Sequence, residues 1–124
     1  MRTPSVDVTA NGQQLPLALG DDPLRIDLAF DASPSGIVNP AEVYFGLATA
    51  SGAFFLDPTF RLSPFPVPLY TGPLVSFPPV TVVNLPSAGA LPPGTYVWFV
   101  VVDANANGVI EGTFFDYVIT FITP

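Results

Sequence analysis

Apolar and polar residues alternate along much of the chain, most regularly at residues 24–31. One row of this segment is apolar and the other is charged at three of its four positions: Leu24, Ile26, Leu28 and Phe30 against Arg25, Asp27, Ala29 and Asp31. A period of two is typical of a strand with one buried and one solvated face. We therefore predict a strand here, with Arg25 and Asp27 as a solvated ion pair that contributes little to stability.

Turn signals divide the rest of the chain into short segments of the same kind. Asn11-Gly12, Asn39-Pro40 and Ser51-Gly52 are typical turn dipeptides. Between the turns we predict further strands at 6–8, 15–19, 42–49, 53–56, 80–85, 95–103 and 114–123. About seven to nine short strands predict an all-β fold, an immunoglobulin-like (fibronectin type III-like) antiparallel β-sandwich, as a single domain over residues 1–124. A jelly roll or a small barrel is the alternative.

Residues 58–79 differ in composition from the rest. Seven of these 22 positions are Pro. The segment also contains four aromatic residues, Phe60, Phe65, Tyr70 and Phe77. The segment is too apolar for a free linker and too rich in Pro for a central strand, because Pro has no backbone N–H to donate. We expect an extended crossover lying on the sandwich, and we expect Pro78-Pro79 to precede the next strand.

The two C-terminal strands are apolar on both faces. In residues 95–103 the two rows are Val97, Phe99 and Val101, and Tyr96, Trp98, Val100 and Val102. In residues 114–123 they are Phe115, Tyr117, Ile119 and Phe121, and Phe114, Val118 and Ile122. A two-layer sandwich buries only one face of each sheet, so the second face of this pair needs a cover. Either the crossover at 58–79 folds over it, or another subunit or a neighbouring domain does.

Composition narrows the possible functions. The chain has 124 residues, ten Asp and Glu, three Arg and no Lys, His or Cys, which gives a formal charge of −7. No basic patch is available for nucleic acid or for anionic lipid. The longest apolar run, residues 96–102, is too short for a membrane-spanning helix, so we expect no membrane insertion. The missing residue types exclude the common nucleophile–base pairs and zinc–thiolate sites, and we expect no catalytic residue.

A low charge content favours association. Charged residues make up only 10% of the chain and apolar residues 49%. Soluble monomers usually carry more surface charge, and edge strands without Lys are poorly protected against strand addition. We therefore predict self-association, or contact with neighbouring extracellular domains.

The sequence Asp-Ala-Asn-Ala-Asn-Gly-Val-Ile-Glu at residues 103–111 carries the most specific chemical signal. Its side-chain oxygens, its Gly and one carbonyl fall where calcium loops place them, because a hard cation needs several oxygens from one tight turn. Phe114 occupies the place of the usual bidentate Glu, and Asp116 is the substitute we consider. The predicted Ca²⁺ ligands are Asp103, Asn105, Asn107, the carbonyl of Val109, Glu111 and Asp116. A plain hairpin with Asn107-Gly108 as its turn is the alternative.

The order of these motifs resembles a family of bacterial secreted, surface-associated immunoglobulin-like domains. The matching segments are residues 6–12, 72–74, 91–96, 102–109 and 114–118. Most distinctive is Pro-Pro-Gly-Thr-Tyr at 92–96 leading into Asp-x-Asn-x-Asn-Gly at 103–108, whereas Tyr117 stands where the family has a small residue. The resemblance implies an extracellular or cell-surface β-sandwich without catalytic activity. Residues 1–5 lack an apolar leader, so we expect that the chain either stays in the cell or has lost one.

The sequence is compatible with three functions. The leading one is a structural module that assembles into a surface layer or filament, stiffened by calcium. The second is a carbohydrate-binding or adhesive module, with an aromatic platform beside Asp57 formed by Phe54, Phe55, Phe60, Phe65 and Tyr70. For these rings we favour packing in the core or crossover, because Phe lacks a polar group for a wet site. The third, an enzyme that uses Glu111 with Asp103 or Asp116, is disfavoured because a bound cation would keep these carboxylates ionised.

Overall fold

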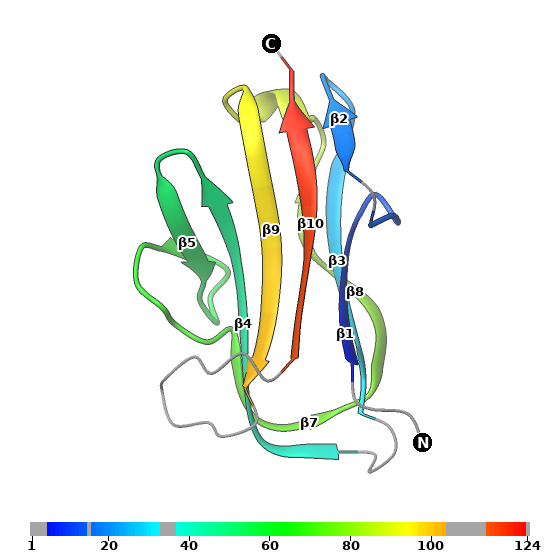
Figure 1. Ribbon diagram of the computed structural model, residues 1–124, viewed down its shortest axis with the longest axis vertical. Helices are drawn as coiled ribbons and strands as arrows, with labels where there is room; N and C mark the ends of the chain where they lie inside the picture. The colour runs from blue at the N-terminus through cyan, green and yellow to red at the C-terminus, as the bar shows by residue number, and fades with distance from the viewer. Residues whose placement is uncertain (1–4, 15, 33–36, 104–113, 124) are drawn as a thin grey trace.

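A computed structural model describes residues 5–14, 16–32, 37–103 and 114–123 (Figure 1). These ranges hold ten strands and one short 3₁₀ helix, η1, at Ala88–Ala90. The strands are β1 (Ser5–Ala10), β2 (Leu17–Leu19), β3 (Leu24–Asp31), β4 (Ile37–Thr49), β5 (Gly52–Leu56), β6 (Leu62–Ser63), β7 (Tyr70–Val75), β8 (Phe77–Leu85), β9 (Gly94–Asp103) and β10 (Phe114–Ile122). The prediction of an all-β sandwich is confirmed.

The strands form two sheets of unequal width. The three-stranded sheet has the order β1-β3-β8, and the seven-stranded sheet has the order β2-β10-β9-β4-β5-β6, with β7 also paired to β4. The long β4 serves two neighbours on one side, because β7 pairs with its first half and β5 with its second half. Among the described strands, β2 alone runs parallel to its partner, β10.

The core lies between the two sheets and is built from alternate residues. In β3 the row Leu24, Ile26, Leu28 and Phe30 is buried, as the alternation predicts. From the seven-stranded sheet the Trp98 ring stacks on Phe45 and on Tyr96, at centroid distances of 6.4 and 6.3 Å. The Trp98 indole N–H donates to Thr120 Oγ1 at 3.0 Å, so its one polar atom is satisfied inside the core.

Tyr96 ties the start of β9 to the preceding turn. Its hydroxyl donates to the carbonyl of Pro92, four residues earlier, at 2.6 Å. Immunoglobulin-like sandwiches carry this arrangement, the tyrosine corner, near the start of their penultimate strand. β9 occupies that place here, because β10 follows it as the last strand.

Residues 58–79 contain more regular structure than we predicted. They supply β6, β7 and the start of β8, and Pro78-Pro79 lies inside β8. The pairing of β8 with β3 shifts register between Val80 and Phe77, which is where the two Pro residues fall. Pro is tolerated at such irregularities and on edge strands, because no ladder hydrogen bond is lost there.

The start of β4 also differs from the prediction. We placed a turn at Asn39-Pro40, but the strand runs through it from Ile37. The pairing of β4 with β7 shifts register between Val38 and Ala41, so Pro40 falls within a bulge.

Candidate functional site

The base of the predicted calcium loop lies at the end of β9. Asp103 pairs in register with Glu42 of β4, so both carboxylates project from the same face of the seven-stranded sheet. Directly opposed residues place their Cβ atoms about 4.5–5.5 Å apart. Both side chains are buried, although acidic residues are seldom buried without a compensating interaction. The register thus brings together two carboxylates that are 61 positions apart in the sequence.

Tyr44 lies beside this pair and responds to its charge. Burial is the main cause that raises the pKa of Tyr44 above its ordinary value of 10.0, and the negative charge of Glu42 is the next. A side-chain hydrogen bond to Glu42 and the charge of Asp103 raise this pKa further. Tyr44 is therefore a spectroscopic reporter of the charge at this end of the sheet.

Asp116 does not join Asp103. β10 pairs with β9 so that Asp116 lies opposite Val100, whereas Asp103 projects from the other face of β9. The Asp116 carboxylate accepts hydrogen bonds from the Val8 N–H at 2.8 Å and from Gln14 Nε2 at 2.6 Å. Its place in the structure is thus the junction of β1 with β10.

The remaining predicted ligands, Asn105, Asn107, Val109 and Glu111, lie outside the described residues. Within the described ranges no group of three or more acidic side chains is positioned to hold a metal ion. Glu42 is the neighbour that sequence reasoning missed. The available signal was a charged residue at the start of the mostly apolar segment 42–49 that we predicted as a strand.

Part of the outer face of the seven-stranded sheet, which points away from the three-stranded sheet, is covered by the chain itself. Phe55 of β5 packs edge-on against Phe99 and Tyr44, at centroid distances of 5.6 and 6.3 Å. The Phe99 ring lies over Gly46, where a Cβ would come within 2.6 Å of it. On the same face Tyr44 is only 1% exposed.

β10 leaves its outer face open. We name Phe115, Tyr117, Ile119 and Phe121 the apolar stripe, since these alternate residues share one face of β10. Phe115, Tyr117 and Phe121 are 58%, 49% and 41% exposed. The first two rings contact each other, with centroids 5.7 Å apart.

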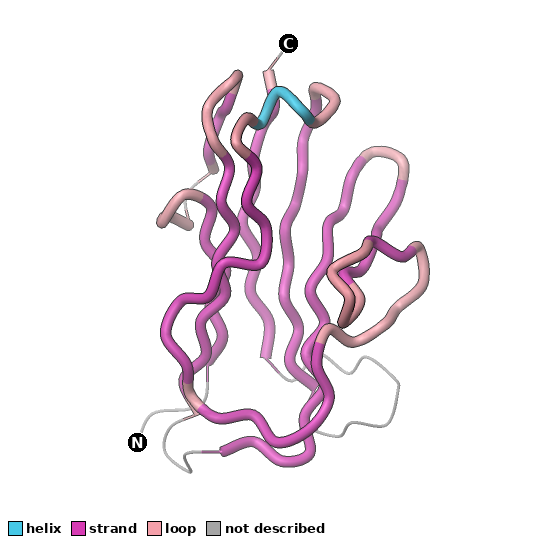
Figure 2. Tube along the Cα trace, turned by 180° about the vertical axis from the view of Figure 1, so that it is seen from behind, coloured by secondary structure: helices cyan, strands magenta, loops and turns pink. Residues whose placement is uncertain are grey.

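The crossover does not cover the apolar stripe, so the first of the two alternatives, cover by residues 58–79, is wrong for β10. β6 pairs with β5, β7 with β4 and β8 with β3. Residues 58–79 therefore follow the β4–β5 side of the seven-stranded sheet and then cross to the other sheet (Figure 2).

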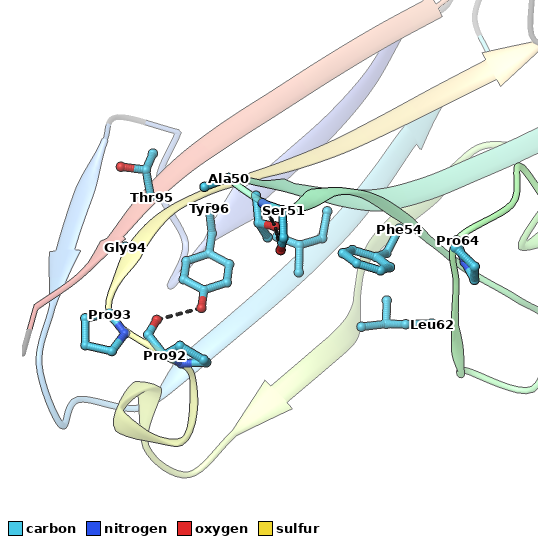
Figure 3. Close-up of a pocket in the computed structure, with 12 residues that line it drawn as sticks. Ala50, Ser51, Phe54, Leu62, Pro64, Pro92, Pro93, Gly94, Thr95 and Tyr96 are labelled. Atoms are coloured by element: carbon cyan, nitrogen blue, oxygen red, sulfur yellow. Dashed lines mark hydrogen bonds between the residues drawn. The ribbon is translucent and has the colours of Figure 1, made fainter.

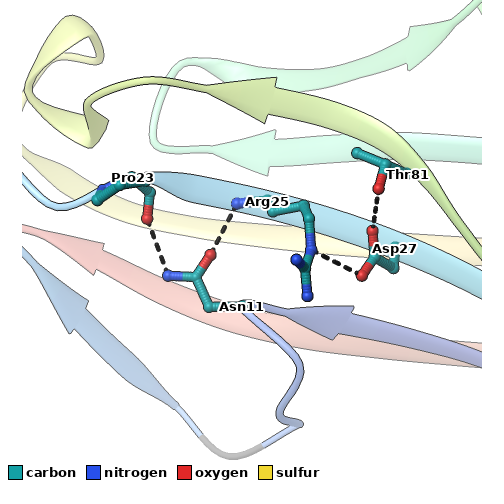
Figure 4. A network of polar contacts seen from close by, with 5 residues as sticks. All are labelled: Asn11, Pro23, Arg25, Asp27 and Thr81. Atoms are coloured by element: carbon teal, nitrogen blue, oxygen red, sulfur yellow. Dashed lines mark hydrogen bonds and ion pairs between the residues drawn. The ribbon is translucent and has the colours of Figure 1, made fainter.

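The three-stranded sheet has a polar outer face (Figure 4). Arg25 Nε donates to Asp27 Oδ2 at 3.0 Å, and Thr81 Oγ1 donates to Asp27 Oδ1 at 2.7 Å. Asn11 joins the same face to the turn before β3, because its side chain accepts from Arg25 N and donates to the Pro23 carbonyl. Asp27 is buried by these partners and is not the solvated residue that we expected.

A shallow apolar pocket of about 620 Å³ lies at the end of the sheet near the tyrosine corner (Figure 3). Phe54 and Leu62 form one part of its lining and Pro92-Pro93 another. Tyr96 is its one ionisable side chain, and the Tyr96 hydroxyl already donates to Pro92. The pocket offers apolar contact and a few hydroxyls, but no acid–base pair.

The turn after β5 holds an aromatic ring in solvent. Asp57 Oδ1 accepts from the Thr59 N–H, the Thr59 hydroxyl and the Arg61 N–H, at 2.9, 2.6 and 3.0 Å. Phe60 stands in the left-handed region, with φ of 63°, and is 61% exposed. Phe65 is 70% exposed, so these two rings are not packed as we favoured.

Comparisons with known proteins add no further identification. No model of a known protein family matches this chain, and a search of curated proteins finds no match. Within the described residues, no helix is long and apolar enough to cross a membrane.

Proposed function

We propose that this chain is a non-catalytic structural module that associates with further copies of itself, in an extracellular or cell-surface assembly. The observation that carries the proposal is the apolar stripe of β10, whose rings are about half exposed in the described structure. Contiguous apolar surface of this kind marks interaction sites on soluble proteins.

The distribution of charge supports the same proposal. The exposed charged side chains of the described residues are Asp7, Asp21, Asp22 and Arg25 in the first part of the chain and Arg61 in the turn after β5. The apolar stripe contains none. With a formal charge of −7 on each copy, repulsion opposes contact elsewhere on the surface and is weakest where a face carries no charge.

Sedimentation of the purified chain tests self-association. We expect the mean mass to rise between about 1 and 100 µM protein, and to rise further with salt because added ions screen the repulsion between copies. Electron microscopy of the concentrated sample is expected to show filaments or sheets. A monomer at all concentrations and salt levels would contradict the proposal.

The calcium-stiffened hairpin belongs to the same proposal. What supports it is the loop spacing that begins at Asp103, together with the opposed Glu42 at its base. A divalent cation held by the loop would reduce the repulsion between two opposed carboxylates and fix the β9–β10 connection. An affinity of roughly 0.1–1 mM, as in extracellular modules, is expected.

A thermal unfolding series in Ca²⁺ tests this part. We expect 10 mM CaCl₂ to raise the Tm by several degrees, because a ligand that binds only the folded state stabilises it. Asp103→Asn should abolish the shift and Glu42→Gln should reduce it. Asp116→Asn is the control, because its place between β1 and β10 predicts an unchanged response to Ca²⁺. An equal shift in Asp103→Asn would remove the site.

Carbohydrate binding is the second candidate, and the exposure of Phe60 and Phe65 favours it. Exposed rings near the Asp57 turn could stack on sugar faces. Glycan-array binding that is lost in Phe65→Ala and kept in Phe115→Ser would support this candidate. Absence of binding to all glycans would exclude it.

A further inference from the structure

A second apolar surface lies on the other side of the molecule from the apolar stripe. It is a groove of about 390 Å³ between β8 and the β4–β7 pair, which we name the β7–β8 groove. Val75, Val80 and Phe77 contribute to its walls, and Phe60 and Tyr70 stand at it. β7 and β8 lie toward the reader in Figure 2, whereas β10 is on the far side of that view.

The groove exists because the two sheets differ in width. Three strands cannot cover the whole inner face of a seven-stranded sheet, and the groove lies where Val43 and Leu74 of the wider sheet meet Val80 of β8, at the edge of the narrower one. None of the side chains that line the groove carries a charge. The Tyr70 hydroxyl already donates to the Pro73 carbonyl, so the lining offers almost no unpaired polar group.

The apolar stripe and the groove are alike in chemistry, because both are apolar and neither contains a charged side chain. Phe115 and Tyr117 project as a contacting pair of rings from a strand surface, whereas the groove is concave. A cavity of about 150 Å³ accommodates one benzene ring. By that measure, the groove of about 390 Å³ has room for both rings.

From these observations we infer that copies associate head to tail, with the Phe115–Tyr117 pair of one copy seated in the β7–β8 groove of the next. The inference rests on the proposed self-association and names its geometry. Two different surfaces on opposite sides form a heterologous contact, which continues from copy to copy and gives an open filament where the rotation does not close a ring. A two-fold dimer through the apolar stripe alone would stop at two copies.

Three variants separate these geometries. Phe115→Ser/Tyr117→Ser removes the projecting rings, and Val80→Asp places a charge in the groove at a half-exposed position. Asn84→Asp adds the same charge to an exposed position of β8 outside the groove, and is the matched control. Fluorescence of the buried Trp98, unchanged from the wild type, establishes that each variant folds.

Sedimentation of each variant alone and of an equimolar mixture is the deciding experiment. We expect the ring variant and Val80→Asp each to stay monomeric, with association weakened at least tenfold, while Asn84→Asp assembles like the wild type. An equimolar mixture of the ring variant and Val80→Asp should form a one-to-one dimer and nothing larger. The intact rings of the Val80→Asp copy bind the intact groove of the ring variant, and no further ring–groove pair remains.

The remaining outcomes overturn one proposal or the other. If Val80→Asp assembles like the wild type while the ring variant does not, the head-to-tail geometry is wrong and self-association through the apolar stripe stands. If the mixture stays monomeric, the rings do not bind the groove. If the wild type itself never associates, the proposed function fails together with its geometry. A Val75→Asp variant gives a second test of the groove should Val80→Asp not fold.

Discussion

The outer faces of the two sheets differ in almost every respect. That of the three-stranded sheet carries Asp7, Arg25 and Asp27, and its buried carboxylate is satisfied by Arg25 and Thr81. That of the seven-stranded sheet is mostly apolar from β10 to β5, with Glu42 and Asp103 at one end and Thr95 at the other. One face is compatible with water without any further partner, whereas the other needs a cover. The chain itself provides that cover over β4 and β9 but not over β10.

Two tyrosines on the apolar face give the largest expected contrast. Tyr44 is buried and Tyr117 is half exposed, although both project from the outer side of the same sheet. Tyr44→Ala should lower the free energy of unfolding by about 3–5 kcal/mol, as large-to-small changes in a core do. Tyr117→Ala should change it by no more than about 0.5 kcal/mol. Urea unfolding of dilute protein measures both, and equal losses would show that the two halves of the face do not differ.

The sequence predicted the strands that follow local rules and missed those that depend on neighbours. The alternation at 24–31 identifies β3 correctly, because the apolar residues of one row all point toward the core and this pattern is visible in the local sequence. β7 and the start of β8 were missed because Pro73 and Pro78 are acceptable only on an edge or at a shift of register, and neither property is local.

The candidate site was predictable to a similar extent. Asp103 stood out by the spacing of its loop, and the apolar rows of β10 by composition. Glu42 was missed because only the β4–β9 register brings it opposite Asp103. Asp116 was assigned to the loop because the sequence predicted its strand but not which face of that strand points into the core. Phe55 of β5 packs against Phe99 of β9 on the outer face, whereas β10 has no such neighbour among the described residues. The local sequence pattern does not reveal this difference, because it depends on how the strands pair.

The polar face provides the next largest effect. Asp27→Ala should lower the free energy of unfolding by about 1–3 kcal/mol, because the hydrogen bonds that Thr81 and Arg25 donate to this buried carboxylate are lost. Asp7→Ala, at an exposed position of β1 on the same face, should stay within about 0.5 kcal/mol of the wild type. Chemical unfolding of both variants makes the comparison, and a loss of similar size in Asp7→Ala would show that the hydrogen-bonded network is not what stabilises this face.

The acidic end of the apolar face can be examined through Tyr44. Its raised pKa means that the folded state favours the neutral phenol. The stability that this group contributes is therefore fully present below pH 10.0 and is lost as the pH rises through the higher pKa of the folded state. Glu42→Gln should lower the pKa of Tyr44, and so should Ca²⁺ if the loop binds it. Absorbance at 295 nm follows the titration, and Tyr44→Phe identifies the transition among the four tyrosines.

A Glu42→Gln variant whose high-pH transition stays in place would show that this carboxylate does not act on Tyr44. A transition that moves in the variant but not in Ca²⁺ would keep the electrostatic link and count against the cation.

The smallest expected effect concerns Asp57, an acidic residue in the turn between β5 and β6 that remains in contact with water. The Thr59 hydroxyl is the largest cause that lowers the pKa of Asp57 below its ordinary value of 3.8, and the Arg61 N–H is the next. A lowered pKa means that the stability contributed by this carboxylate is present above pH 3.8 and is lost as the pH falls through the lower value of the folded state. Solvent screens this exposed group, so Asp57→Ala should shift the unfolding midpoint less than Asp27→Ala does. Thr59→Val should return the pKa of Asp57 toward 3.8 in a carboxyl NMR titration, because the largest stabilising hydrogen bond is gone. If Thr59→Val leaves this pKa unchanged, the Thr59 hydroxyl does not stabilise the ionised form of Asp57. The hydrogen bonds of this turn would then have no measurable effect on its carboxylate.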